Sequence, residues 1–292
     1  MRVTDASSSF GSLAGLQSAA SRLASLQAQL SSGRQITTPS DNPSGTARAL
    51  QLRADVKRNN QYVSNARDAV GWMSTADSAY TQAVTLTQNA RTLVVQALNT
   101  GTGSTSSASA IADQLDAIRT SLIQVANTTY NGRPVFGGTT AGTVAYDPAG
   151  NYVGDAGTVS RTIGAQATVQ INQTGPQAFG APGSDLFTLL SNISTTLRTN
   201  PAAATPQLTQ LDAALSRITS AQAAEGATYQ QVQNTQAVQS ATGTSLATQL
   251  SDLQDIDLAD MAVRVSTANV TYQAALQTTA NVRQISLLNF LR

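Results

Sequence analysis

The most constraining feature of this 292-residue chain is a pair of amphipathic helical patterns, one near each end, that contain very few charges. The first pattern repeats apolar residues at steps of three and four: Leu13, Leu16, Ala20, Leu23, Leu26 and Leu30. The second does the same before the chain closes on an apolar tail: Leu258, Met261, Val265, Ala268, Tyr272, Ala275, Val282, Ile285, Leu287, Leu288, Phe290 and Leu291. A helix with such a stripe must bury it against another helix. We therefore predict that the large apolar residues of both patterns form an assembly interface, within one chain or between copies.

The composition favours a helical rod over a wide globular core. Aromatic residues make up only 4% of the chain, and charged residues 11%, against ~25% in typical soluble domains. The net charge of +1 provides no long-range field for nucleic acid or for an anionic membrane surface. Cysteine and histidine are both absent, which removes thiolate nucleophiles, the commonest general base and the commonest metal ligands. We expect no enzyme activity, no cofactor, no metal, no nucleic-acid partner and no membrane insertion.

The middle of the chain predicts long helices around a short insertion of another kind. One heptad register extends through a second helix, with interruptions at Asp77 and Arg91: Ala49, Leu52, Val56, Asn59, Val63, Ala66, Val70, Met73, Tyr80, Val84, Thr87, Val94 and Leu98. Helical spacing recurs over 111–125, 186–197 and 208–253, with a break at Pro201 and Pro206. Between these helices, 133–183 is dense in glycine and carries short alternating runs, which are typical of strands.

The predicted fold is mainly α: a long antiparallel coiled-coil-like rod with paired terminal helices and a small β-rich insertion. We expect three parts: a terminal assembly domain (1–42 with 250–292), a long-helix core domain (43–132 with 184–249) and a β-rich outer domain (133–183).

Turn and cap residues mark the boundaries of these elements. Gly33 is placed to end the first helix, and Asn42 to cap the second, with Pro43 at its first position. The segment 147–151 predicts a turn between two short strands.

Two charged groups admit other interpretations. The acids Asp252, Asp255, Asp257 and Asp260 lack the spacing of a calcium loop, and we expect them to complement the dipole of the last helix. The basic stretch 48–67 predicts a solvated helix face, or contact with an acidic neighbour in an assembly.

Two further motifs resemble the flagellin superfamily. The first is the turn Leu30-Ser31-Ser32-Gly33 followed by Pro39-Ser40-Asp41-Asn42-Pro43, and the second is the tail Leu287-Leu288-Asn289-Phe290-Leu291. Within the superfamily, the proline-flanked connector and the segment Asn131-Gly132-Arg133-Pro134-Val135-Phe136-Gly137-Gly138 resemble the subunits of the hook–filament junction more than the filament subunits.

The resemblance implies a structural subunit of the extracellular bacterial flagellum, exported through the flagellar type III apparatus without a cleaved signal peptide. The implied partners are other copies of the chain in a ring, hook-associated protein 1 on the hook side, flagellin on the filament side and an export chaperone at the C-terminus. Two alternatives stay open: a short flagellin that forms the filament itself, and a secreted adhesin whose β insertion binds a surface ligand.

Overall fold

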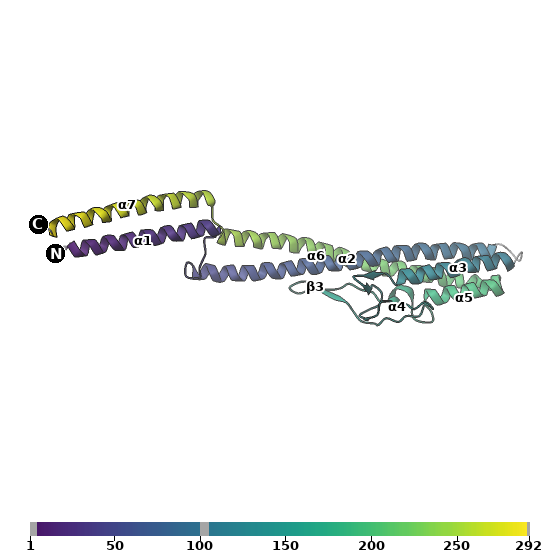
Figure 1. Cartoon of the computed structure of the whole chain (residues 1–292). Coiled ribbons are helices and arrows are strands. Elements are labelled where there is room, and N and C mark those ends of the chain that lie inside the picture. The colour runs from purple at the N-terminus through teal and green to yellow at the C-terminus, as the bar shows by residue number, and fades with distance from the viewer. Residues whose placement is uncertain (1–4, 100–104, 291–292) are drawn as a thin grey trace. The chain divides into compact units, whose positions relative to one another are not determined.

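The computed structural model describes residues 5–99 and 105–290, and the chain within them is mainly helical (Figure 1). It divides into two compact units. The first combines the chain up to Arg58 with the chain from Gly243 onward, and the second spans Asn59–Thr242. The predicted division into three parts stays a prediction, and the two units are described in turn below.

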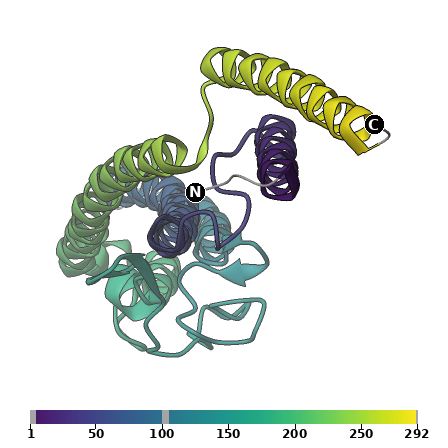
Figure 2. The ribbon, with the colours of Figure 1, turned by 90° about the vertical axis from the view of Figure 1, so that its left-hand side faces the viewer.

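The first unit contains the paired helices α1 (Asp5–Ser32) and α7 (Leu258–Phe290). They pack along each other and run antiparallel (Figures 1 and 2). The groove between them is lined by Ala19 and Leu26 of α1 and by Val263 and Thr271 of α7. The first helix ends as predicted at Gly33, whose φ of +68° is a conformation that favours glycine. The predicted pairing of the terminal helices is confirmed.

The connector between α1 and α2 (Pro43–Asn99) is held by two side chains. The Asp41 carboxylate accepts hydrogen bonds from the backbone N–H groups of Thr37 (3.2 Å) and Thr38 (2.8 Å). The bonds from Thr38 are the main reason that the pKa of Asp41 is lowered to about 2. Asn42 Oδ1 accepts from the backbone N–H of Gly45 at 2.8 Å, so Asn42 caps α2 as predicted.

Polar side chains join α2 to α6 (Thr205–Gln254) along a seam. The two helices are antiparallel, since later residues of α2 pair with earlier residues of α6. In the first unit, Arg53 donates to Gln254 (3.0 Å). In the second unit, the seam consists of Asn59 with Gln239 (2.8 Å), Asp77 with Gln222 (2.9 Å) and Arg91 with Asp212 (2.5 Å). The two residues that interrupt the apolar register, Asp77 and Arg91, are therefore members of this seam.

The residues of the predicted heptad register of α2 are all buried or half-buried. The helix has 57 residues and contains Gly71 without a break. A Cβ at Gly71 would lie 2.5 Å from Oη of Tyr130, so the close approach of this tyrosine accounts for the glycine.

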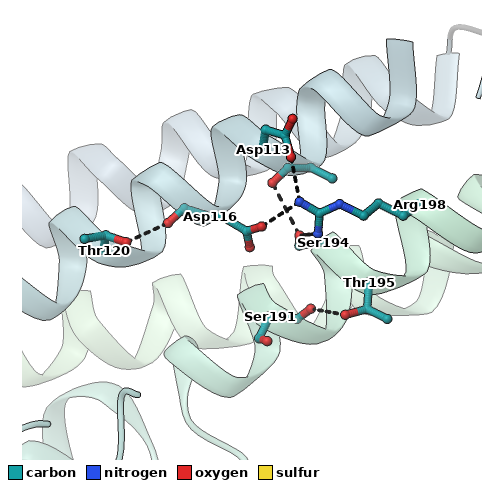
Figure 3. A network of polar contacts seen from close by, with 8 residues as sticks. Asp113, Asp116, Thr120, Ser191, Ser194, Thr195 and Arg198 are labelled. Carbon is teal, nitrogen blue, oxygen red and sulfur yellow. Dashed lines mark hydrogen bonds and ion pairs between the residues drawn. The ribbon is translucent and has the colours of Figure 1, made fainter. Parts of the chain in front are cut away.

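The second unit also contains α3 (Thr105–Ala126) packed against α5 (Leu186–Thr199), with the 3₁₀ turn η2 (Pro201–Ala204) after α5. Arg198 on α5 joins the two helices, because its guanidinium donates to Asp113 and to Asp116 of α3 at 2.7 Å each (Figure 3). Pro206 lies at the start of α6. The predicted break at Pro201 and Pro206 is present, since α5 ends at Thr199 and α6 begins at Thr205, and a proline in the first turn of α6 removes no helical hydrogen bond.

We expect Arg198→Met to cause a small loss of stability that depends on salt. The guanidinium is exposed to water, and ions screen such a pair. The change should lower the Tm by about 1–2 °C in dilute buffer and by less in about 1 M salt, measured by circular dichroism. Arg198→Lys is the matched control, because it keeps the charge. An equal loss with both variants at all salt concentrations would mean that packing, and not charge, is the contribution of Arg198.

Two small antiparallel hairpins form the β part of the second unit. They pair β1 (Thr129–Tyr130) with β2 (Arg133–Pro134), and β3 (Ser160–Gly164) with β4 (Ala167–Gln170). The predicted turn at 147–151 is present, since the Gly150 N–H donates to the Asp147 carbonyl at 2.9 Å and Tyr146 bridges to Tyr152. Turns and loops make up most of the rest of this insertion, with the short helix α4 (Gly175–Phe179) near its end.

Aromatic side chains gather between this insertion and the helices around it. Tyr80 of α2 contacts Phe136, which contacts Phe179 of α4, and Tyr146 contacts both Phe179 and Phe187, with ring centroids 4.7–6.0 Å apart. All five are buried. The few aromatic residues of the chain are therefore concentrated where irregular backbone has to be fixed by packing.

Candidate assembly interface

The predicted interface residues of α1 form one side of the terminal helix pair. Leu16, Leu23, Leu26 and Leu30 are half-buried, whereas Leu13 is exposed. Because the half-buried residues recur at steps of three, four and seven, they lie on a single face of α1. This face packs against α7.

The predicted residues of α7 form the other side. Met261 is buried, Val265 and Tyr272 are half-buried, and Leu258 is 63% exposed. The side chains of Val282, Ile285, Leu287, Leu288 and Phe290, and the whole of Leu291, lie outside the described part of the structure. The two stripes thus cover each other within one chain, and their role in assembly between chains stays a prediction.

The structure adds an apolar face that the sequence reasoning missed. Val263 and Val270 of α7 are 65% and 64% exposed. At 100° per residue they lie almost opposite the buried Met261 and Ala268, on the more exposed side of α7, and Val263 also borders the groove that α7 forms with α1. We call Val263 and Val270 the outer face of α7. Their spacing of seven residues was the available signal, but the stronger stripe on the other side of the helix obscured it.

A shallow groove of about 270 Å³ lies along the seam between α1 and α7. Small side chains, Ala19 and Ala268, form part of its wall, and Arg22 and Arg264 provide its charge. Arg264 also pairs with Asp260 at 2.7 Å, one turn earlier on α7. The groove therefore offers a mixed apolar and basic surface next to the outer face.

Backbone pairing fixes the base of the helix pair. The Gln35 N–H donates to the Gln254 carbonyl at 2.6 Å, and the Ile256 N–H donates to the Gly33 carbonyl at 3.2 Å. These bonds bring the end of α1 to the start of α7, which sets the register of the two helices.

Three of the four acids near this base are used by the fold. Asp257 accepts from the backbone N–H groups of Ala259 (2.8 Å) and Asp260 (3.3 Å), and Asp260 lies in the first turn of α7, which agrees with the predicted complement to the helix dipole. Asp255 accepts from the Ser251 hydroxyl (2.7 Å). Over 5–99 and 105–290, no three acidic, histidine or cysteine side chains are grouped to hold a metal.

Two arginines of the basic stretch on α2 are paired within the chain. Arg58 pairs with Asp55, and Arg53 bonds to Gln254 at 3.0 Å. Among the described helices, none has the length and apolar content needed to cross a membrane.

Family models match both ends of the chain. The bacterial flagellin N-terminal helical region matches residues 6–141, and the bacterial flagellin C-terminal helical region matches residues 208–291. The two matches include α1, α2, α3, α6 and α7. The unmatched middle, 142–207, contains the β3–β4 hairpin, α4 and α5.

Individual relatives agree with these models. Flagellar hook-associated protein 3 of Escherichia coli K12 is 28% identical over 78% of this chain and 80% of its own length. A flagellin of Bacillus subtilis is 27% identical over 90% of this chain and 91% of its own length. The crystal structure of flagellar hook-associated protein 3 from Legionella pneumophila shares the fold, with a TM-score of 0.62, 15% identity and coverage of 70% of this chain and 98% of that one.

Proposed function

Because this chain belongs to the bacterial flagellin family, we propose that it is a structural subunit of the flagellum that joins the hook to the filament. It acts outside the cell, as part of an assembled tube, and it carries out no catalysis. The observation that carries the proposal is the similarity to hook-associated protein 3 over four-fifths of that protein's length.

The terminal helix pair fits an assembling subunit. α1 and α7 each cover one apolar stripe of the other within the chain, and the outer face of α7 stays exposed to water. Burying two valine side chains contributes about 3 kcal/mol at each subunit contact. We infer that the outer face of α7 is covered by neighbouring subunits in a ring.

The partners follow from the position in the tube. Hook-associated protein 1 contacts the subunit on the hook side, and flagellin contacts it on the filament side. An export chaperone covers the apolar C-terminal tail, including Leu287, Leu288, Phe290 and Leu291, before export. In this proposal 1–42 and 250–292 form the assembly domain, 43–132 and 184–249 the core domain, and 133–183 the outer domain.

A short flagellin is the second candidate function, because the Bacillus subtilis flagellin aligns over 91% of its own length. The two candidates differ in self-polymerisation. A filament subunit adds to its own end without limit, whereas a junction subunit adds a layer that its own copies do not extend.

We expect purified subunit to add a single layer to isolated hooks that carry hook-associated protein 1, and not to extend filament fragments. Electron microscopy with labelled subunit measures the added length. In cells that lack the gene, we expect hooks without filaments and flagellin in the medium. Continuous extension of filament fragments would support the flagellin alternative and contradict the junction function.

A further inference from the structure

A buried carboxyl group in the second unit has no partner in the described structure. Glu225 of α6 is 5% exposed, and neither Oε1 nor Oε2 accepts a hydrogen bond from a described residue. Its neighbours along the same face of α6, Ala221 and Val232, are buried and apolar. An ionised carboxylate is costly in such a place unless a cation or several donors pair with it.

Neither of the ionisable groups beside Glu225 offers it a positive charge. Burial raises its pKa to about 8, and the negative charge of Asp77 on α2 adds to the effect. Glu225 in turn raises the pKa of Tyr80 on α2, after the larger effect of burial. Both neighbours are acids, so neither neutralises Glu225.

A cavity of about 390 Å³ lies beside Glu225. It is formed between α2, α6 and the segment that follows β4. Its lining includes four carboxamides and one hydroxyl, all uncharged hydrogen-bonding groups: Gln170, Asn172, Gln173, Gln177 and Thr228. The site therefore combines one negative charge with a polar wall.

We propose that this cavity is a binding site for a guanidinium group, which pairs with both oxygens of Glu225. A carboxylate whose two oxygens are both free matches the two parallel N–H donors of a guanidinium. A single positive charge also balances the single negative charge of the site. The remaining N–H donors of the guanidinium face the uncharged oxygens of the wall.

A metal ion fits the same cavity poorly. Calcium and magnesium bind six or more oxygens, usually with more than one carboxylate. Glu225 is the only carboxylate among the residues that line this cavity. The distribution of basic residues in the chain agrees with a guanidinium ligand, since Lys57 is the only lysine among 17 basic residues and the others are arginines.

Entry of the ligand requires side chains at the edge of the cavity to turn. The two carboxylate oxygens are out of contact with solvent, so the cavity opens beside them. Gln170 and Gln177 are exposed, and both line the cavity. Gln170 donates to the Asn172 carbonyl and Gln177 accepts from the Thr174 N–H, at 2.9 Å each, so entry opens these two bonds but needs no change of fold.

The test uses the full-length chain and N-acetyl-arginine amide, which carries one positive charge, with N-acetyl-citrulline amide as its neutral counterpart. At about pH 9, where Glu225 is ionised, the arginine compound at about ten times its Kd should raise the Tm by about 2–4 °C. The citrulline compound should not. Glu225→Gln should abolish the shift, and Asp113→Asn, which alters an exposed carboxyl of the same unit, should preserve it.

The pH dependence gives an independent readout. The shift should shrink by at least about fivefold at about pH 6, because the proton that then occupies Glu225 competes with the guanidinium. The proposal is overturned by an equal shift in wild type and Glu225→Gln, by an equal shift with the citrulline compound, or by no shift at any concentration.

A second arm identifies the source of the guanidinium, and this arm alone rests on the proposed function. If an arginine of a neighbouring copy fills the cavity, sedimentation at about pH 9 should show self-association that Glu225→Gln weakens about tenfold and that the arginine compound inhibits. If the compound binds but self-association is unchanged, the ligand is a free guanidinium compound. Failure of the junction function affects only this second arm.

Discussion

Replacing Val263 and Val270 together with aspartate should abolish incorporation of the subunit into the flagellum and leave the isolated subunit folded. Both side chains are about two-thirds exposed, and although Val263 borders the groove with α1, the isolated chain loses little packing. Surface changes of this kind usually alter stability by less than about 0.5 kcal/mol. The helical content and the Tm of the monomer should therefore stay close to those of wild type.

The effect on assembly is large because both valines are buried again in the proposed contact. Each contact loses about 3 kcal/mol of apolar burial and gains two carboxylates that must leave water, at a cost of several kcal/mol. The affinity between subunits should fall by at least about 100-fold, which prevents ring formation. Pull-down with hook-associated protein 1 and swimming assays on complemented cells measure this loss.

Two matched variants make the result interpretable. Val153→Asp places the same charge on an exposed valine of the β-rich insertion and should leave assembly intact. Met261→Asp places it on the buried face of α7 and should lower the stability of the helix pair itself. Normal swimming of the Val263→Asp, Val270→Asp double variant would contradict the role of the outer face in assembly.

Glu225→Gln should stabilise the second unit at neutral and alkaline pH. The pKa of Glu225 is raised from 4.5 to about 8 in the folded chain, so the folded state holds a proton that the unfolded state has released. The free energy of unfolding of wild type therefore falls as the pH rises from about 4.5 to about 8, and it is constant above that range. Glutamine carries no charge at any pH and removes this loss.

We expect the variant to gain about 2–4 kcal/mol over wild type at about pH 9. This range allows for the buried amide that replaces the carboxyl group. At about pH 4 the two proteins should differ little, because Glu225 is then protonated in the folded state and largely protonated in the unfolded state. Urea unfolding monitored by circular dichroism at several pH values gives the comparison.

Asp77→Asn provides a graded control for the same effect. The change removes the nearby negative charge, while the new amide oxygen still accepts the hydrogen bond from Gln222. The pKa of Glu225 should fall by less than one unit, with a correspondingly small gain in stability. If the free energy of unfolding depends on pH in the same way for wild type and Glu225→Gln between about pH 5 and 9, a positive charge already neutralises the Glu225 carboxylate in solution. That result would contradict the prediction.

Local patterns in the sequence were sufficient to identify most of the helices. The register of α2 and the cap at Asn42 depend on neighbouring residues along one helix, so the sequence alone predicts them. The glycine-dense insertion was recognised by its turns, but its aromatic core was not predicted. Phe136, Phe179 and Phe187 meet only because α4, α5 and an irregular segment come together in the folded chain.

The same contrast applies to the candidate interface. The stripes predicted which faces of α1 and α7 are apolar, because spacing on a helix determines direction around its axis. They could not predict that one face would be covered within the chain and that Val263 and Val270 would stay exposed. That outcome depends on which face of α7 meets α1, and the bonds from Gln35 and Ile256 set this arrangement.

The sequence by itself therefore determined the helices, their ends and the family of this protein, since each of these depends on residues close together along the chain. Only the tertiary structure decided which polar residues are paired and which are left alone. Asp77 and Arg91 meet partners on α6 more than a hundred positions away, whereas Glu225 on the same helix meets none. Burial and pairing depend on distant segments that folding brings together. The spacing of residues along one helix therefore cannot predict which polar groups are paired.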